Sequence, residues 1–283
     1  MPTSPQTVTS PAFAGHNTAL AEDEALLPAV VVAVKAAGAH LRDRFSPDAR
    51  LDSLDDVVAE IHANDDASVG FLREPLEKAR PRARWAEDEL EGGVLPAGEW
   101  WVTDPVEGNI NHIHGMTDWA VTATLVRDNQ PVLTAVHLPL TDETYTAVRG
   151  SGAHLNGVRL RPSAKTRLDA ALVGTGQAKP GEDERTFDLI GRSVTAMLTN
   201  ALVTRVSVPA TLQLIQIAAG RMDVFWQYSE VRSGLVAGAL LVAEAGGTVT
   251  DTRGRPWSLA SEDFLAAAPA VHPVAVDVLS ALR

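Results

Sequence analysis

Two hydrophobic periods alternate along this chain, and together they restrict it to folds that layer helices on sheets. Between residues 27 and 45, apolar side chains recur every three or four positions, which predicts an amphipathic helix that ends at Pro47. β-Rich runs at 120–126 and 132–138 are separated by the polar turn 127–130, which predicts a β-hairpin. A change from a helical to a strand period within one chain is typical of the α/β class.

The second half of the chain continues this alternation. Asn156-Gly157 lies between alternating side chains and predicts another tight hairpin. Helices are expected at 210–219 and 235–245, each followed by glycine, which is a common C-terminal stop signal. A strand-like segment at 222–228 lies between them, so we predict an α/β fold throughout.

Length and composition bound the number of domains. With 283 residues, of which 45% are hydrophobic, the chain can bury one large core or two closely packed halves. No composition break marks independent domains, so we expect one domain over residues 23–283 with a soft boundary between its halves near 162–168. Residues 1–22 lack a basic start and a continuous apolar stretch, and they predict a flexible tail rather than a signal peptide.

Charge and cysteine content exclude several classes of function. The formal net charge is −12 and the basic residues are scattered, which argues against a nucleic-acid partner because such binding relies on clustered Lys and Arg. The chain has no cysteine, so thiol chemistry is excluded and a reducing cytoplasm is the expected location. The most apolar early segment, 25–41, is shorter than the roughly 20 residues of a membrane span, so we expect a soluble protein.

Four motifs follow one another in a specific order. They are W-W-V-T-D-P-V-E-G-N-I-N-H-I-H-G (100–115), G-S-G-A-H-L-N-G-V-R-L (150–160), A-A-G-R-M-D-V-F (218–225) and A-L-L-V-A-E-A-G-G-T-V-T-D-T-R-G-R-P-W (239–257). The first resembles the inositol monophosphatase motif W-x-x-D-P-[ILV]-D-G-T-x-N-F-x-H-G, and the others resemble further motifs of the same family. Because all four occur in the family's order, the chain is identified as similar to inositol monophosphatases.

This resemblance implies a layered αβαβα sandwich, as in inositol monophosphatases and fructose bisphosphatases, that is usually a homodimer and hydrolyses small phosphate monoesters with Mg²⁺. Mg²⁺ prefers oxygen ligands, and clustered carboxylates supply both the oxygens and the charge. Matched by motif position, the expected metal ligands are Glu87, Asp104, the backbone carbonyl of Val106, and Glu107. Asp56 matches the family's Asp that orients the attacking water.

The chain departs from the family pattern at several of these positions. Glu107 replaces an Asp and is one methylene longer. Asn109 replaces a Thr that helps to activate water, and an amide cannot relay a proton as a hydroxyl can. Gly234 stands where the family has an Asp ligand at a helix N-terminus. Because even an outer partner of a metal is worth about 10- to 100-fold in affinity or activity, we expect at most one well-held Mg²⁺ ion and no other cofactor.

The substrate side also differs from the family. Val208-Pro209-Ala210 replaces a Gly-[ST]-Ala segment, and proline removes a backbone donor. Gln227 replaces the carboxylate that binds inositol, so inositol monophosphate is not the expected substrate. Gly108 and Asn109 of the D-P loop remain candidate substrate contacts.

A helix N-terminus near the missing ligand offers a different kind of site. Ser233 and Gly234 would open this helix, with free N–H groups and the positive end of the helix dipole, beside Arg232. This arrangement predicts a site for a phosphate or carboxylate group that needs no metal, although simple drift of the sequence explains it equally well.

Five other residues need interpretation, and three of them have two interpretations each. Glu230 or Asp251 could supply the absent carboxylate, or either could be an ordinary solvated side chain. His112 replaces the usual Phe and is either a general base or metal ligand, or a hydrogen-bonded structural histidine. His62 stands where the family commonly has Asp and is expected to be structural or exposed, whereas His114 matches the family's own His.

Three functions agree with these observations, and the sequence leaves open whether the protein is an enzyme. The first is a divergent family member with an impaired two-metal site, whose pocket takes a small polar or anionic metabolite for binding or for non-phosphatase biosynthetic chemistry. The second is a Mg²⁺-dependent phosphomonoesterase acting on a non-inositol sugar or cyclitol phosphate. The third is a structural or regulatory dimer without a ligand. The altered positions favour the first, and the retained carboxylates support the second.

Overall fold

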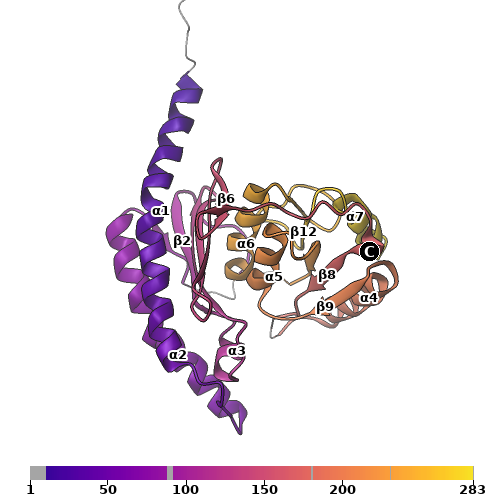
Figure 1. Cartoon of the computed structure of the whole chain (residues 1–283), viewed down its shortest axis with the longest axis horizontal. Helices are drawn as coiled ribbons and strands as arrows, with labels where there is room; N and C mark the ends of the chain where they lie inside the picture. Colours follow the sequence, from indigo (N-terminus) through magenta and orange to yellow (C-terminus); the bar gives the residue numbers. More distant parts are fainter. Residues whose placement is uncertain (1–10, 88–91, 180, 230, 283) are drawn as a thin grey trace, which may run out of the picture.

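The computed structural model describes residues 11–87, 92–179, 181–229 and 231–282, and it alternates helices and sheets in the order αβαβα (Figure 1). The helices form the outer and central layers: α1 (Pro11–Arg44) and α2 (Leu54–Ala79) on one side, α5 (Ala210–Ala218) and α6 (Arg232–Ala245) in the centre, and α4 (Glu184–Asn200) and α7 (His272–Ser280) on the other side. The predicted α/β class and layered sandwich are therefore confirmed.

Two sheets separate these layers. The first has seven strands in sequence order: β1 (Arg84–Trp85), β2 (Glu99–Glu107), β3 (Ala120–Arg127), β4 (Gln130–Leu138), β5 (Glu143–Val148), β6 (Gly152–Leu155) and β7 (Val158–Arg159). The second has five strands in the order β11 (Thr248–Thr250), β12 (Phe264–Ala267), β10 (Val224–Gln227), β8 (Leu172–Thr175) and β9 (Val203–Val206). The chain leaves the first sheet after β7 and enters the second at β8, so the boundary expected near 162–168 lies between the sheets.

Both predicted hairpins are present, and their turns explain why. Asp128 and Asn129 join β3 to β4 with φ angles of 47° and 63°, and Asn156 and Gly157 join β6 to β7 with φ angles of 48° and 81°. Two successive residues with positive φ form the tight turn whose twist matches that of the flanking strands. Asn, Asp and Gly tolerate this backbone conformation better than other residues do.

Helix α1 is longer than the sequence pattern suggested. It begins at Pro11, upstream of the boundary expected at residue 23, and it ends at Arg44 rather than at Pro47. Residues 1–10 of the expected tail lie outside the described residues. The apolar segment 25–41 was expected to be too short to span a membrane. The longer helical segment Ala19–Arg44 could cross a membrane by its length and composition alone. However, one face of it is buried against the first sheet, as in the core helix of a soluble protein.

The central helices pack so closely that one contact requires glycine. A Cβ atom at Gly238 of α6 would lie 2.3 Å from Cδ1 of Leu214 on α5, so no larger residue fits. This contact fixes α5 against α6 and thereby places the N-terminal ends of both helices beside the end of β2. Gly246, with a φ angle of 99°, ends α6 as the sequence predicted.

Candidate active site

Two carboxylates lie at the end of β2, where the strand meets the central helices. Asp104 accepts a hydrogen bond from the backbone N–H of Val106 at 3.0 Å, and the strand register shifts between Asp104 and Glu107. The hydroxyl of Thr211 on α5 lies 3.1 Å from Oε2 of Glu107 and 3.0 Å from the carbonyl oxygen of Gly234 on α6. β2, α5 and α6 thus converge on this carboxylate pair.

The pair is held in an environment that disfavours its charges. Burial, helped by the nearby carboxylate of Asp65, raises the pKa of Asp104 to about 7, against the lowering effect of the Val106 N–H. Burial and the adjacent Asp104 carboxylate raise the pKa of Glu107 well above its usual value, while the Thr211 hydroxyl lowers it. Two acidic groups in this position call for a compensating proton or cation.

A cavity of about 220 Å³ opens onto the pair. Its walls come from the β8–α4 connection, the segment before α5, strand β10 and the start of α6, and they include Lys179, Pro209, Gln227, Ser233 and Gly234. The predicted substrate contacts Gln227, Ser233 and Gly234 therefore face one cavity together with Asp104 and Glu107. The amide nitrogen of Gln227 donates to the carbonyl oxygen of Ser229 at 2.8 Å, which fixes this side chain.

Gly234 occupies the position where the family has an aspartate, and the structure leaves space there. A Cβ atom at residue 234 would lie 4.0 Å from Oε1 of Glu107, 3.9 Å from Cβ of Ala210 and 3.8 Å from Cγ1 of Val231. These are ordinary van der Waals separations. A carboxylate introduced at residue 234 would therefore point to the existing pair without a steric clash.

Two of the expected site residues lie away from this pair. Glu87 is exposed and forms an ion pair with Arg73 of α2, with 2.7 Å between Oε1 and Nη2. Asp56 lies in the exposed first turn of α2, where its carboxylate accepts a hydrogen bond from the Ser53 hydroxyl at 2.7 Å. Among the described residues, no group of three or more acidic, histidine or cysteine side chains could hold a metal ion.

The side chain of Asn109 is hydrogen-bonded to helix α2 and not to Asp56. Its amide nitrogen donates to Oδ1 of Asp65 at 2.9 Å and to the carbonyl oxygen of Ile61 at 3.1 Å, and its oxygen accepts from Asn64 at 3.0 Å. All of its polar atoms thus have protein partners. Gly108, which precedes it with a φ angle of 88°, packs against Pro209 and the Asp118 carbonyl.

His112 is a structural histidine in this arrangement. Its Nε2 atom lies 3.1 Å from the carbonyl oxygen of Leu41, so it donates, and its Nδ1 atom accepts from the amide of Asn64 at 3.0 Å. Its ring packs edge-on against Phe45 and Trp119. Burial lowers its pKa, which favours the neutral form. Both ring nitrogens have protein partners, as the structural interpretation of this histidine expects.

The remaining candidates also have other partners. The guanidinium of Arg232 donates to the carbonyl oxygens of Gly92 and Gly93 at 2.6 and 3.2 Å, and it lines a separate small cavity instead of the one beside Asp104 and Glu107. Asp251 pairs with Arg255 at 2.6 Å and does not replace the missing ligand. Glu230 lies outside the described residues.

His62 and His114 are both exposed side chains. His62 is exposed, as expected. His114 is also exposed, and its Nδ1 atom lies 2.7 Å from the carbonyl oxygen of Ile110 within the same short helix. Neither histidine lines the cavity beside Asp104 and Glu107.

Sequence reasoning missed several residues that the fold brings to this region. Asp65 and Asn64 of α2 contact Asn109, Thr211 holds Glu107, and Lys179 brings a positive charge to the cavity wall. For one of them a signal existed. Asn64, Ser68, Leu72 and Leu76 follow one another at four-residue intervals and therefore lie on one face of α2, which is buried. A polar residue such as Asn64 on this face needs a hydrogen-bond partner, and this indicated a contact with another part of the chain.

The chemistry of the residues present fits Mg²⁺. Mg²⁺ usually keeps several waters and binds through one or two carboxylates together with the phosphate of its substrate. Asp104 and Glu107 supply two such carboxylates at one cavity, and a cation there would offset the unfavourable burial of both charges.

Comparisons with known proteins agree with this geometry. The sequence model of the inositol monophosphatase family matches residues 22–282. The chain is 35% identical to an inositol-1-monophosphatase of Rhizobium meliloti over 81% of this chain and 86% of that protein. It is 32% identical to a putative Nus factor SuhB of Neisseria meningitidis, with the same coverage of both chains.

A solved structure extends the likeness to the fold. The extragenic suppressor protein SuhB of Bartonella henselae superposes with a TM-score of 0.75 at 27% identity, over 90% of this chain and 99% of that protein. The family model, which matches residues 22–282, spans both sheets and the carboxylate pair. This chain belongs to the inositol monophosphatase family, whose members depend on Mg²⁺ and act on phosphorylated small molecules.

Proposed function

We propose that this protein is a Mg²⁺-dependent phosphomonoesterase that acts on a small sugar or cyclitol phosphate other than inositol monophosphate. The observation that carries this proposal is the desolvated pair Asp104 and Glu107, which lies at the wall of a cavity of about 220 Å³. Unpaired buried carboxylates are unfavourable, and a cation bridging protein and phosphate removes that penalty.

The metal in this proposal is one ion held by Asp104, Glu107 and the carbonyl oxygen of Val106. When bound, Mg²⁺ would act as a Lewis acid that polarises the phosphoryl group and assists the attack of water. Thr211 would orient Glu107 through the hydrogen bond to Oε2. Glu87 would join the site only by exchanging its ion pair with Arg73 for the metal, so we keep it as the weakest member of the predicted set.

The substrate contacts in this proposal differ from those expected from the sequence. Lys179, rather than Arg232, brings positive charge to the cavity, and the N-terminus of α6 at Ser233 and Gly234 adds the positive end of a helix dipole. Gln227 offers a neutral amide where a carboxylate would bind inositol hydroxyls. This combination suits an anionic group better than a fully hydroxylated ring alone.

The competing hypothesis is that the cavity binds a small anionic metabolite without hydrolysing its phosphate. Two observations favour it: Gly234 supplies no carboxylate, and every polar atom of Asn109 is bound to α2. Under this hypothesis the water-activating arrangement is absent, whereas ligand binding persists.

One experiment separates the two hypotheses. Release of inorganic phosphate is measured from a panel of sugar, cyclitol and nucleotide phosphates with Mg²⁺ or Mn²⁺, using wild type and Asp104→Asn. Turnover of about 1 to 1000 per second that is lost in the variant is the expected result. If both proteins release only equal trace amounts of phosphate from every substrate, the proposed phosphatase activity is refuted.

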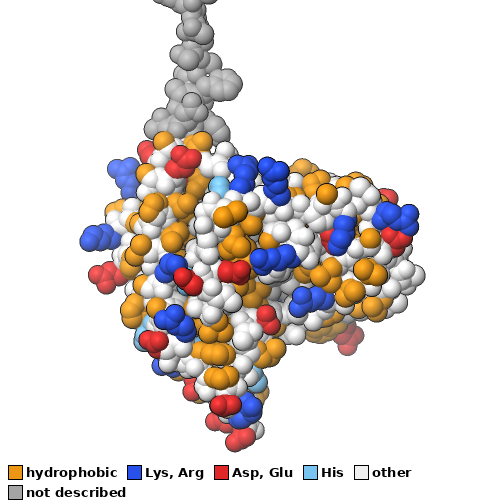
Figure 2. Space-filling view, viewed as in Figure 1, with side chains coloured by type: hydrophobic (Ala, Val, Ile, Leu, Met, Phe, Trp, Pro, Cys, Tyr) orange, Lys and Arg blue, Asp and Glu red, His pale blue; other side chains and the backbone are white. Residues whose placement is uncertain are grey.

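We also propose that the protein is a cytoplasmic homodimer without nucleic-acid or membrane partners. Hydrophobic side chains gather over α4 and the edge strand β9 (Figure 2), among them Leu198, Leu202 and Val206, which are 62%, 66% and 55% exposed. Exposed apolar edge strands are normally covered by another chain or element. In sedimentation, we expect wild type to be a dimer and the Leu202→Glu and Val206→Glu variants to be monomers. A monomeric wild type would contradict this proposal.

A further inference from the structure

A cavity of about 160 Å³, here called the α6 cavity, lies between the first sheet and the C-terminal half of α6. Its walls come from the β3–β4 turn, the end of β5, helix α6 and the segment that follows β11. None of the described residues that line it also lines the cavity beside Asp104 and Glu107, which opens at the N-terminal end of the same helix. The two cavities are therefore separate sites along α6.

Arg149 brings a positive charge with available donors to the α6 cavity. Its Nε atom donates to the carbonyl oxygen of Pro131 at 3.0 Å, which restrains the guanidinium plane. Its two Nη groups have no hydrogen-bond or ion-pair partner within the described parts of the chain. Glu244 lies near enough to act on Arg149 electrostatically, but its two oxygens accept from the backbone N–H groups of Gly150 and Gly152 at 2.9 Å each. The outer edge of the guanidinium is therefore a paired donor that an anion can use.

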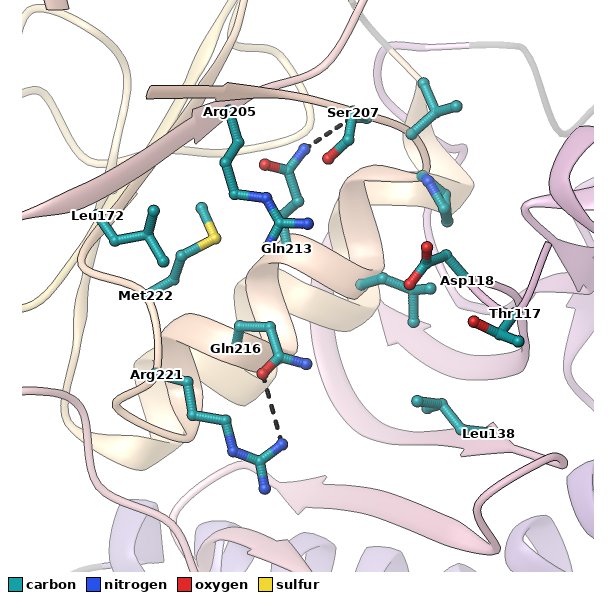
Figure 3. Close-up of a pocket in the computed structure, with 13 residues that line it drawn as sticks. Thr117, Asp118, Leu138, Leu172, Arg205, Ser207, Gln213, Gln216, Arg221 and Met222 are labelled. Carbon is teal, nitrogen blue, oxygen red and sulfur yellow. Dashed lines mark hydrogen bonds between the residues drawn. The ribbon is translucent and has the colours of Figure 1, made fainter. Parts of the chain in front are cut away.

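The cavity between β9, α5 and the Thr117–Asp118 loop lacks this arrangement. Figure 3 shows that Arg205 and Arg221 lie on opposite sides of α5 there, so their guanidinium groups do not converge. Asp118 also lines that cavity, and its charge would repel an anion. By contrast, the described lining of the α6 cavity has one cation and no acidic side chain.

Much of the remaining wall of the α6 cavity is apolar. Ala239, Leu240 and Ala243 line it from α6. Trp257 lines it with its indole ring, which is held by an edge-on contact with Phe264 at 5.3 Å between ring centroids. An apolar cavity of about 150 Å³ holds a benzene molecule, so 160 Å³ is room for one six-membered ring. A flat ring suits this wall because aromatic pairs contribute more than their buried area alone.

The other polar groups of the α6 cavity are neutral. Asn129 has both polar atoms of its side chain bound to the backbone of Leu95, at 2.6 and 2.9 Å. Gln130 and Ser258 also line the wall and carry no charge. A phosphate dianion would therefore meet only one positive group, whereas a carboxylate has the single negative charge that Arg149 matches.

We propose that the α6 cavity is a second ligand site, which binds a small aromatic carboxylate. The carboxylate would accept two parallel hydrogen bonds from the Nη groups of Arg149, and the ring would lie between Trp257 and the alanines of α6. None of these residues belongs to the metal or substrate set proposed above. The site therefore stands on its own observations and does not depend on the proposed phosphatase activity.

Calorimetric titration of the full chain in chelator tests the proposal, with benzoate as the probe. Benzamide has the same shape without the charge, and acetate has the charge without the ring. We expect saturable binding of benzoate with a dissociation constant of about 1 mM or lower, which a ligand of this size can reach. Benzamide and acetate should each bind at least about tenfold more weakly, because each lacks one of the two groups that the cavity recognises.

Two variants place the probe in the α6 cavity. Arg149→Gln should weaken benzoate binding by at least about tenfold, the loss expected for a charge-assisted hydrogen bond. Ala243→Leu keeps the guanidinium but fills the cavity from an exposed position of α6, and it should abolish binding. Arg82→Gln, which removes an exposed charge outside this cavity, is the matched control and should bind as wild type does. Binding should also survive Asp104→Asn.

Each other result overturns the proposal. No saturable binding of benzoate, or equal affinity for benzoate and either benzamide or acetate, removes the proposed ligand class. Equal affinity of the Arg149→Gln and Arg82→Gln variants makes the effect one of general charge, and loss of binding in Asp104→Asn assigns the probe to the cavity beside the carboxylate pair. Melting curves without ligand establish that the variants are folded, and if Arg149→Gln is not, Ala243→Leu decides. Absence of phosphatase activity with benzoate binding retained would refute the proposed function and leave this site intact.

Discussion

Replacing Gly234 by aspartate tests the carboxylate pair most directly, because the structure leaves room for the new side chain. The substituted Cβ atom would lie 4.0 Å from Oε1 of Glu107, so the new carboxylate would lie close to the existing one. In a partly solvated site, two like charges about 4 Å apart repel by up to about 4 kcal/mol, and by less to the extent that Glu107 keeps its proton. Without metal, Gly234→Asp should therefore be less stable than wild type.

Added Mg²⁺ should reverse this difference. A third carboxylate in the site should raise metal affinity by at least about 10- to 100-fold, the range seen when a metal partner is lost. At saturating metal that gain corresponds to about 1.4 to 2.7 kcal/mol of additional stability. For a chain of this size it amounts to a few degrees of melting temperature, because about 1 kcal/mol shifts the midpoint by about 2 °C.

The assay is thermal unfolding at pH 8 with chelator and with a series of Mg²⁺ concentrations. Gly234→Asn is the matched control, since it has the same shape without the charge. The expected result is a lower midpoint for the Asp variant in chelator and a larger rise with Mg²⁺. If Asp and Asn variants respond equally to Mg²⁺, residue 234 does not face a metal site and the assignment of this cavity is wrong.

Three further predictions follow from the hydrogen bonds and pKa values of the site. Because the pKa of Asp104 is raised from 3.8 to about 7, the native state keeps a proton between these pH values that the unfolded chain has lost. The contribution of Asp104 to stability in chelator, measured as the difference between wild type and Asp104→Asn, should therefore be most favourable below pH 4 and should be lost as pH rises through 7. Mg²⁺ should restore stability mainly at pH 8, and a difference independent of pH would contradict the burial of this group. Thr211→Val removes the hydroxyl that binds Glu107 and should cost about 1.5 to 3 kcal/mol in denaturant unfolding, with Thr211→Ser close to wild type. His112→Phe should lower the free energy of unfolding by about 1 to 3 kcal/mol, because it removes the partner of the Asn64 amide and of the Leu41 carbonyl. The shape of the pH profile of phosphate release should not change. Loss of one limb of that profile would instead make His112 a general base.

Local chemistry explains the parts of the fold that were predictable. The Asn156-Gly157 turn and the C-terminal stop at Gly246 depend on φ angles that few residues tolerate, so the residue types alone indicated them. The buried face of α1 followed from its apolar spacing. Its start at Pro11 did not, because the first residues carry no such period.

The site was less predictable because its contacts join distant parts of the chain. Asp56 matched a family motif, but α2 begins at Leu54, which leaves Asp56 in the first turn. Asp65 follows nine residues later, about 13 Å along the helix axis, and it is the acidic residue of α2 that contacts Asn109. Motif matching identifies a residue type, whereas the length of the helix decides which acidic residue reaches the site.

The same reasoning explains why the carboxylate pair depends on the central layer of the fold. Thr211 bonds both to Glu107 and to the carbonyl oxygen of Gly234, so the orientation of this glutamate is set by how α5 lies against α6. That spacing is fixed by the absence of a side chain at Gly238, where Leu214 fills the gap. A longer acid at residue 107 can therefore be held in one position although its side chain has an additional rotatable bond. The substitution of Glu for Asp changes the reach of the ligand, and the contact with Thr211 limits the freedom that this change would otherwise introduce.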